Sequence, residues 1–242
     1  MSEKLLDFEK LNIAFEGSDA QAVLKWALKT FNGKVAFANS FGAEDAALTH
    51  MLVNIDPTTR IFTLDTGRLS NETYELWAKL EETYGIRIEP YFPDAKAVEE
   101  MVRQHGINLF YRSVDLRKLC CRVRKIEPLR RALSGADAWI TGLRREQSMT
   151  RARLLKVEED KANGGTVKVN PLADWTEKDV WDYIRENRIP YNQLHDLNYP
   201  SIGCAPCTRA VAPGEDLRAG RWWWEKPETK ECGLHRKNSS SI

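Results

Sequence analysis

The chain has 242 residues, of which 42% are hydrophobic and 29% are charged, a balance typical of soluble globular proteins. Its 36 lysines and arginines against 35 aspartates and glutamates leave a formal net charge of +1, which argues against a general nucleic-acid-binding protein. No apolar run approaches the ~18 residues that a membrane span needs, and the N-terminal sequence lacks the apolar segment of a secretory signal. We therefore expect a cytoplasmic protein.

The hydrophobic pattern predicts strands that alternate with helices. A helical region over residues 1–33 ends at Asn32-Gly33. Apolar runs predict buried strands at 35–39, 61–65, 86–92 and 138–142, and periodicity predicts helices at 46–53, 71–83, 114–133 and 176–187, the last capped by Asp174 or Thr176. This alternation is typical of an α/β fold with a mostly parallel sheet and helices on both faces.

After residue 190 the composition changes, because tyrosine, proline, glycine, cysteine and tryptophan dominate and helical periodicity is weak. We therefore divide the chain into an α/β domain at 1–189, with an N-terminal helical preface, and a C-terminal segment at 190–242. The second part is expected to fold over the sheet, with a flexible end, and not to be an independent domain.

Three loops follow predicted strands and contain small or charged residues. They are Ser40-Phe-Gly-Ala-Glu-Asp45, Leu64-Asp-Thr-Gly-Arg68 and Thr141-Gly-Leu-Arg-Arg145. Ligands of open α/β sheets bind at the carboxyl ends of the strands, and a helix N-terminus there attracts anions. Each loop alone is typical of a plain turn between strand and helix. Three at one sheet edge predict a ligand crevice.

A basic stretch lies within the predicted helix at 114–133. Residues 117–131 contain seven lysines and arginines against Glu127, and Arg144, Arg145, Arg151 and Arg153 follow nearby. A solvated helix face is the usual explanation of such a run. Here the run includes two cysteines, cations favour thiolate over thiol, and arginine forks suit phosphate and sulfate oxygens. We therefore favour an anion site.

The five cysteines form two pairs and one single residue: Cys120 with Cys121, Cys204 with Cys207, and Cys232. An odd number in a cytosolic chain argues against a disulfide framework. Buried structural thiols, or a thioredoxin-like redox pair in Cys204-Ala-Pro-Cys207, are alternatives. Two pairs of thiolates can hold zinc or an iron–sulfur cluster. Adjacent cysteines on a helix point in different directions, which favours a [4Fe–4S] cluster over zinc.

Cys232 lies near the C-terminus, followed by Gly233 and, three residues on, by His235. An incidental surface thiol is the simplest interpretation. A nucleophilic thiolate that approaches a substrate is the alternative, since neighbouring cations would lower its pKa. The Trp222-Trp223-Trp224 run just before it more often means packing than chemistry.

Together these residues resemble the assimilatory adenylyl-sulfate reductases, within the wider phosphoadenylyl-sulfate reductase family. The resemblance runs from about Phe37 to His235. Its markers are Ser40-Phe-Gly-Ala-Glu-Asp45, Leu64-Asp-Thr-Gly-Arg68, Cys120-Cys-Arg-Val-Arg-Lys125 with Pro128-Leu129, Ile140-Thr-Gly142, Cys204-Ala-Pro-Cys-Thr-Arg209, Gly220-Arg-Trp-Trp-Trp224 and Glu231-Cys-Gly-Leu-His235. It implies an adenine-nucleotide α-hydrolase-like fold of the PP-loop type, with an extended C-terminal tail that carries the nucleophile.

The resemblance also implies a reaction in assimilatory sulfate reduction and cysteine biosynthesis. The Cys232 thiolate attacks the sulfur of adenylyl sulfate and expels AMP, and reduced thioredoxin then releases sulfite from the Cys232 S-sulfonate. One [4Fe–4S] cluster per subunit would be bound by Cys120, Cys121, Cys204 and Cys207. Adenylyl sulfate and thioredoxin are the implied partners, with no nucleic acid or membrane, and the family makes a homo-oligomer plausible.

The same resemblance assigns further site residues one by one. His235 and Lys125 accompany Cys232 as catalytic residues, with Lys125 placed between cluster and substrate. The substrate-binding residues are Ser40 and Gly42 on the phosphate side, Leu64 and Gly142 at the nucleoside, and Arg151, Arg218 and Arg221 near sulfate and phosphate.

The chain departs from the family pattern in two places. Arg117 stands where cluster-containing relatives carry a histidine three residues before the cysteine pair, and the segment 147–151 is one residue shorter than usual. Rival functions are a 3′-phosphoadenylyl-sulfate or dual-specificity reductase, an ATP-pyrophosphatase-like adenylating enzyme, and a non-enzymatic iron–sulfur or zinc sensor. The two cysteine pairs favour adenylyl sulfate over its 3′-phosphorylated form, and Cys232 argues against the last two rivals.

Overall fold

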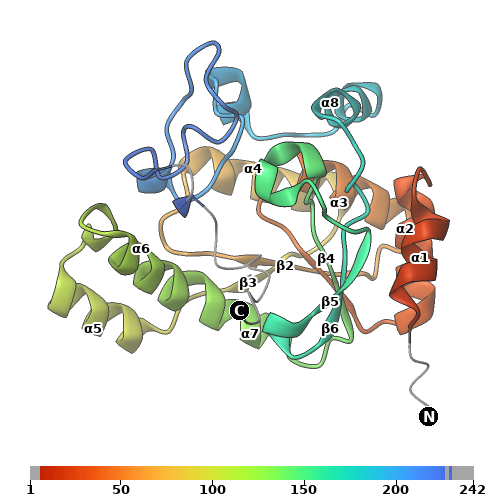
Figure 1. Ribbon diagram of the computed structural model, residues 1–242, viewed down its shortest axis with the longest axis horizontal. Helices are drawn as coiled ribbons and strands as arrows, with labels where there is room; N and C mark the ends of the chain where they lie inside the picture. The colour runs from red at the N-terminus through yellow and green to blue at the C-terminus, as the bar shows by residue number, and fades with distance from the viewer. Residues whose placement is uncertain (1–5, 227–228, 231–242) are drawn as a thin grey trace.

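A six-stranded sheet forms the centre of the molecule (Figure 1). The computed structural model describes residues 6–226, 229 and 230. The strands are β1 (Val35–Ala38), β2 (Arg60–Leu64), β3 (Glu89–Tyr91), β4 (Ala138–Ile140), β5 (Val157–Asp160) and β6 (Thr166–Val169). Their order is β3-β2-β1-β4-β6-β5, and every pairing is parallel except that of β5 with β6. The predicted mostly parallel sheet is confirmed.

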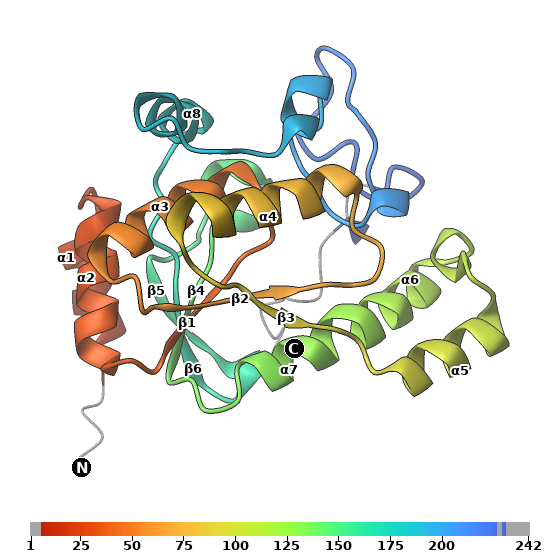
Figure 2. The same ribbon diagram turned by 180° about the vertical axis from the view of Figure 1, so that it is seen from behind.

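Helices cover both faces of this sheet (Figures 1 and 2). They are α1 (Phe8–Phe15), α2 (Ala20–Phe31), α3 (Ala43–Ile55), α4 (Asn71–Tyr84), α5 (Ala95–His105), α6 (Val114–Cys121), α7 (Glu127–Ala132) and α8 (Glu177–Glu186). Successive side chains of β1 point to opposite faces of the sheet, which explains why the strand contributes to two hydrophobic cores. Val35 and Phe37 join the core under α2, α3 and α4, whereas Ala36 joins the opposite core under α7.

The predicted helix over 114–133 is continuous but contains a π-helical turn. Ser113 caps α6 by accepting a hydrogen bond from the Leu116 amide at 3.2 Å. Between α6 and α7, residues 122–126 form a π-helix, and the Glu127 amide donates to the Arg122 carbonyl five residues earlier. Such turns are frequent at functional sites because they shift the helix face that follows. Here the turn comes directly after Cys120 and Cys121.

The predicted positions of strands and helices agree with the structure within a few residues, but α5 and the β5–β6 hairpin were not predicted. Among the side chains of α5, Met101 alone is classed as buried. Because the helix has so few core positions, its sequence gives a weak apolar pattern. Strand β5 reads Val-Glu-Glu-Asp and buries only Val157 completely. Its position at the sheet edge, paired with β6, explains why an acidic strand forms there.

The C-terminal segment from residue 190 crosses the carboxyl edge of the sheet, and its described residues include short 3₁₀ helices at Gln193–Leu197 and Ala205–Cys207 (Figure 1). The Ala205 amide donates to the Arg68 carbonyl at 2.8 Å, which joins this segment to the loop after β2. An isolated antiparallel bridge pairs Thr208 with Arg221. In the described part of the chain, every helix is too short or too polar to cross a membrane.

We predict that Phe37→Ala destabilises the fold by about 3–5 kcal/mol, because truncation of a fully buried aromatic ring leaves a cavity in the main core. Phe37 is 0% exposed on the central strand β1. Urea unfolding at neutral pH measures the change. Ile13→Ala is the control, since Ile13 is 72% exposed. Equal effects of the two substitutions would contradict the assigned core.

Candidate active site

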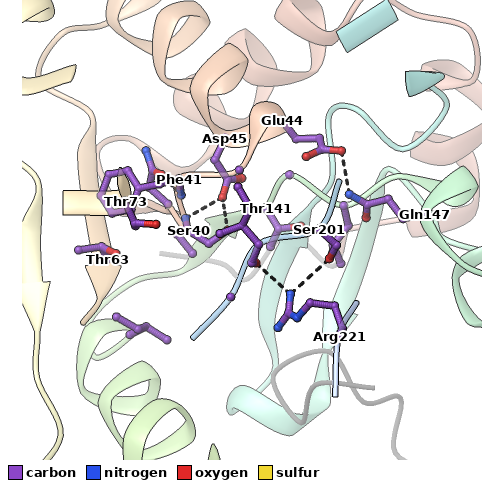
Figure 3. Close-up of a pocket in the computed structure, with 18 of the residues that line it drawn as sticks. Ser40, Phe41, Glu44, Asp45, Thr63, Thr73, Thr141, Gln147, Ser201 and Arg221 are labelled. Atoms are coloured by element: carbon purple, nitrogen blue, oxygen red, sulfur yellow. Dashed lines mark hydrogen bonds between the residues drawn. The ribbon is translucent and has the colours of Figure 1, made fainter. Parts of the chain in front are cut away.

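A pocket of about 220 Å³ opens at the carboxyl ends of β1, β2 and β4 (Figure 3). The loops after these three strands form its floor, and the C-terminal segment closes its opposite side with residues 200–204, 217, 218 and 221. The predicted ligand crevice therefore exists where the three loops meet. Its walls combine backbone amides, hydroxyl groups and cationic side chains, which suit an anionic ligand.

All seven residues predicted to bind substrate line this one pocket. They are Ser40, Gly42, Leu64, Gly142, Arg151, Arg218 and Arg221, and Lys125 lines it as well. The structure thus brings together residues that are up to 181 positions apart in the sequence, from Ser40 to Arg221. Their contact with a substrate stays a prediction. Cys232 and His235 lie outside the described residues.

The loop after β1 is held in an unusual backbone conformation. Phe41 has φ of 63°, in the left-handed region that non-glycine residues rarely adopt. The Asn39 side chain accepts the Phe41 amide at 2.8 Å, and the buried Phe41 ring stacks on Trp77 with centroids 5.6 Å apart. These contacts compensate for the strain and turn the backbone toward the N-terminus of α3.

Asp45 connects this loop to the first turn of α3. One carboxylate oxygen accepts both the Ser40 amide and the Ser40 hydroxyl at 2.6 Å (Figure 3). Burial raises the pKa of Asp45 to about 7, although the two hydrogen bonds from Ser40 act in the opposite direction. Because Ser40 donates to Asp45, its hydroxyl shapes the loop in addition to facing the pocket.

Gly142 allows the loops after β1 and β4 to approach closely. A Cβ atom at this position would lie 2.3 Å from an Asp45 carboxylate oxygen and 2.9 Å from the Glu44 Cβ atom. A side chain there would push apart the two loops that form the pocket floor. The predicted functional importance of Gly142 thus has a steric basis.

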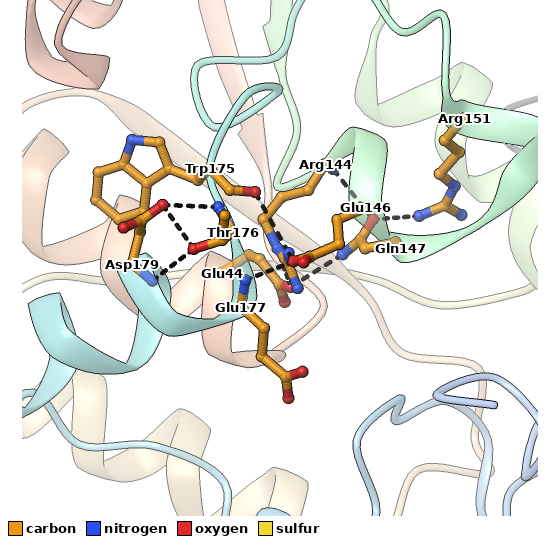
Figure 4. A network of polar contacts seen from close by, with 9 residues as sticks. All are labelled: Glu44, Arg144, Glu146, Gln147, Arg151, Trp175, Thr176, Glu177 and Asp179. Atoms are coloured by element: carbon orange, nitrogen blue, oxygen red, sulfur yellow. Dashed lines mark hydrogen bonds and ion pairs between the residues drawn. The ribbon is translucent and has the colours of Figure 1, made fainter. Parts of the chain in front are cut away.

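A polar network fixes the loop after β4 beside the pocket (Figure 4). Arg144 is 4% exposed and donates to Glu44 at 2.8 Å and to Glu146 at 2.9 Å. Gln147 donates to Glu44 at 3.0 Å and accepts a hydrogen bond from Arg151. The shortened 147–151 segment therefore still places Arg151 at the pocket.

Several of the arginines in and after the basic run already pair with carboxylates. Arg144 and Arg145 were interpreted as part of an anion site, but Arg144 pairs with two carboxylates and Arg145 binds Glu16 through two hydrogen bonds of 2.6 and 2.9 Å. On α7, Arg130 likewise pairs with Glu127 at 2.9 Å. The charges of these three arginines thus have internal partners, although Arg144 also lines the pocket, and an anion-binding role for them stays a prediction.

A second, smaller cavity adjoins the pocket, and all four paired cysteines line it. Cys120 and Cys121 come from the end of α6, and Cys204 and Cys207 come from the C-terminal segment. The other lining residues are Arg68, Phe110, Arg117, Arg124, Lys125, Arg221 and Trp222, with no carboxylate among the described residues. Cys120, Cys204 and Cys207 pack in one apolar cluster with Phe110 and Trp222.

Cations compensate the cysteines in this cavity. Burial opposes ionisation of Cys204, but Lys125, a 3.2 Å contact with the Thr66 hydroxyl, Arg221 and Arg124 outweigh it and lower the pKa of the thiol. For Cys207, burial and the neighbouring cysteines raise the pKa to about 12. The cations of this cavity thus favour the thiolate of Cys204, whereas burial dominates at Cys207.

The donor set fits an iron–sulfur cluster. Four sulfur ligands, an apolar wall and surrounding cations match the chemistry of such a group. The Nε atoms of Arg124 and Arg221 are buried and have no hydrogen-bond partner among the described residues, so they are available to sulfur acceptors. Within the described part of the chain, no group of three or more His, Cys, Asp or Glu side chains is arranged to hold a metal ion. The cluster therefore stays a prediction.

Lys125, Cys204 and Arg221 line both the pocket and the cysteine cavity. Lys125 thus lies between the two cavities, and its role between cluster and substrate stays a prediction. Arg221 is 7% exposed, donates to the Ile202 carbonyl at 2.9 Å and stacks on Trp222 at 4.8 Å. The packing role predicted for the tryptophans is confirmed for Trp222, which is 1% exposed.

Sequence reasoning missed several lining residues. His195 lines the pocket, and its Nε2 atom is buried without a hydrogen-bond partner among the described residues. Thr66 and Arg124 contact each other at the boundary, where Arg124 donates to the Thr66 carbonyl at 2.6 Å. Arg124 follows Cys121 by three residues and was predicted only as a member of the basic run, not as an individual site residue. His195 gave no signal, since nothing in its spacing distinguishes it from a core histidine.

The parallel sheet, with a cation-lined pocket at its carboxyl edge, places the chain among α/β proteins of the adenine-nucleotide α-hydrolase-like, PP-loop type. An NH3-dependent NAD synthetase from Campylobacter jejuni shares this fold, with a TM-score of 0.52 at 12% identity over 80% of this chain and 79% of that one. The model of the phosphoadenosine phosphosulfate reductase domain matches residues 34–210. The chain belongs to that family.

Individual relatives support this assignment. An adenosine 5′-phosphosulfate reductase from Allochromatium vinosum is 60% identical over 203 residues, which cover 84% of this chain and 79% of the relative. The crystal structure of a phosphoadenylyl-sulfate reductase from Candida auris, a phosphate complex, superposes with a TM-score of 0.73 at 30% identity. It covers 87% of this chain and 99% of that chain.

Asp45 predicts a pH dependence of stability. Its pKa is raised from 3.8 to about 7 on folding, so the folded state binds the proton more tightly than the unfolded state. The Asp45 contribution is fully present below about pH 4 and is lost as the pH rises through 7. Compared with the unmodified chain, Asp45→Asn should therefore become relatively more stable between pH 5 and pH 8.

Urea unfolding of both proteins at the two pH values measures this difference, and Asp196→Asn, at an exposed position, serves as the control. Parallel stability profiles for Asp45→Asn and the unmodified chain would show that Asp45 ionises normally.

Proposed function

We propose that this protein reduces adenylyl sulfate to sulfite and AMP in sulfate assimilation, with Cys232 as the nucleophile and thioredoxin as the reductant. Family membership supports the reaction class, and the relative from Allochromatium vinosum carries the name of this activity. The observation that supports it best is the pair of adjoining cavities. One is lined by the predicted substrate residues and the other by the four cysteines, and Lys125 and Arg221 line both.

In the proposed reaction the Cys232 thiolate attacks the sulfur of adenylyl sulfate. A sulfur–sulfur bond forms, the bond between sulfur and the phosphate oxygen breaks, and AMP leaves with that electron pair. A reduced thioredoxin dithiol then supplies two electrons: one thiolate attacks the Cys232 sulfur and expels sulfite, and the second thiol completes a disulfide in thioredoxin. The chain itself gains and loses no net electrons.

The pocket residues act on charge and position. The substrate carries sulfate and phosphate oxygens, and AMP leaves with increased negative charge, so cations that face the departing oxygen lower the barrier. Arg151, Arg218, Arg221 and Lys125 line the pocket and supply those charges. The α3 N-terminus, behind Gly42, adds the positive end of a 13-residue helix.

Cys120, Cys121, Cys204 and Cys207 would hold a [4Fe–4S] cluster in the second cavity. When bound, such a cluster supplies a fixed charge distribution next to the substrate pocket, because the thiol route needs no electron from it. Lys125 faces both sites, so it balances cluster charge and substrate charge together.

Anaerobic incubation with adenylyl sulfate, without thioredoxin, should add one sulfonate group to Cys232. Intact-mass measurement followed by peptide mapping detects the adduct, and Cys232→Ser should show none. A parallel sample receives the 3′-phosphorylated analogue. An adduct with the first substrate alone supports an adenylyl-sulfate reductase, and an adduct with both supports the dual-specificity alternative.

No adduct with either substrate in iron-loaded protein would overturn the nucleophile assignment. The adenylating enzyme would then be preferred if the protein showed turnover that required ATP and Mg²⁺. A non-enzymatic sensor would be preferred if the protein showed no such turnover.

The cluster makes a separate prediction about metal content. Protein purified anaerobically should contain about four iron and four sulfide per chain, the composition of one [4Fe–4S] cluster. The Cys204→Ser protein should lose most of the iron and sulfide, because Cys204 is a proposed ligand that is buried and lines both cavities. Cys232→Ser is the matched control and should keep them. Zinc in place of iron, or equal loss in the control, would contradict the ligand set.

A further inference from the structure

A buried ion pair joins α6 to the chain that follows the three tryptophans. The Arg117 guanidinium donates to both carboxylate oxygens of Glu225, from Nε at 2.8 Å and from Nη2 at 2.7 Å. Both side chains are buried, at 1% and 3% exposure. Glu225 in turn accepts the Thr229 hydroxyl at 3.0 Å. This fork geometry is the strongest form of the arginine–carboxylate pair.

The same guanidinium reaches two further groups. Its Nη2 atom also donates to the Thr229 backbone carbonyl at 2.8 Å, and its plane lies 4.7 Å from the Trp222 ring centroid. Arg117 also lines the cysteine cavity. Burial disfavours its charge, but Glu225 and the Cys121 thiol more than compensate and raise the pKa of Arg117. Arg117 thus stays charged at every physiological pH.

A second arginine contacts the next residue of the same segment. Arg218 donates to the Lys230 carbonyl at 3.4 Å, and the Lys230 ammonium donates to the Ala219 carbonyl at 3.2 Å. Arg218 also lines the substrate pocket. The backbone at 229 and 230 is therefore held from two sides, by Arg117 beside the cysteine cavity and by Arg218 beside the pocket.

We propose that Arg117 is a positioning residue that anchors the start of the Cys232-bearing segment, through Glu225 and the Thr229 carbonyl, to the helix that carries Cys120 and Cys121. This inference rests on the proposed role of Cys232 as nucleophile.

The anchor matters because the tether beyond it is short. Cys232 follows Thr229 by three residues, and three residues of chain span at most ~11 Å. A fixed Thr229 therefore limits the distance that the Cys232 thiol can reach from the anchor, which raises its effective concentration at sites within that distance. A loose anchor would lengthen the tether back to Trp224 and dilute the thiol.

Glu225→Gln tests the anchor without replacing a residue that lines the cysteine cavity. The rate of Cys232 S-sulfonate formation, measured by mass in a single turnover without thioredoxin, should fall about tenfold or more, as expected for a displaced reactive group. AMP affinity and iron content should stay within twofold. Trypsin should cleave after Lys230 faster than in the unmodified chain. Glu225→Asp, which keeps the charge, should recover part of the rate.

Glu215→Gln is the control, because it removes another carboxylate from an arginine fork in the same segment, with Arg209 at 2.8 and 2.9 Å, and its other hydrogen bond comes from the Ala212 amide. It should change neither the rate nor the cleavage. If the unmodified chain forms no adduct, the proposed function itself fails. If it does, an unchanged rate in Glu225→Gln, or a loss of AMP affinity and iron equal to the loss of rate, would overturn the anchoring role.

Discussion

Buried positive charge around the four cysteines is the constraint on which the carboxyl edge of the structure depends. Arg117, Arg124, Lys125 and Arg221 all line the cysteine cavity, and no carboxylate among the described residues lines it with them. A buried charge is tolerated only when paired and hydrogen-bonded. The Arg117 guanidinium pairs with Glu225, which does not line the cavity, whereas the buried Nε atoms of Arg124 and Arg221 have no hydrogen-bond partner among the described residues. The cavity is therefore built to receive negative charge, and an anionic ligand in the adjoining pocket would share these cations.

The parallel sheet and the π-helical turn explain how the two cavities come to adjoin. Parallel strands end at one edge, so the loops after β1, β2 and β4 form a common floor. The turn at residues 122–126 then redirects the helix between the cysteine pair and α7. Arg124 and Lys125 lie within this turn and reach the boundary between pocket and cavity. A regular helix would distribute these residues differently around its axis. Backbone irregularity is thus concentrated where the two sites meet.

Local pattern and motif order were sufficient for the four parallel strands β1 to β4 and for the pocket at their ends, and the spacing of the cysteines was sufficient to pair the residues that line the second cavity. What could not be predicted depends on tertiary contacts. The left-handed Phe41 is stabilised by Trp77, which is 36 residues away in sequence. The raised pKa of Asp45 comes from burial, which no spacing reveals. Arg144 looked like an anion ligand because Glu44, its partner, is 100 residues away. A charge run cannot show which of its members are already paired.

Arg117 shows how a departure from a family pattern becomes interpretable once its partners are known. In sequence it stood only as an arginine where a histidine was expected. An imidazole has two ring nitrogens that point in opposite directions, so it cannot bind both oxygens of one carboxylate and a backbone carbonyl together. The guanidinium does so, with Glu225 and Thr229 as acceptors and Trp222 beneath its plane. The arginine and the glutamate 108 residues later thus form one unit. This unit joins the cysteine helix directly to the described chain at Thr229, so the cysteine cavity and the proposed anchor of the Cys232 segment share one buried contact.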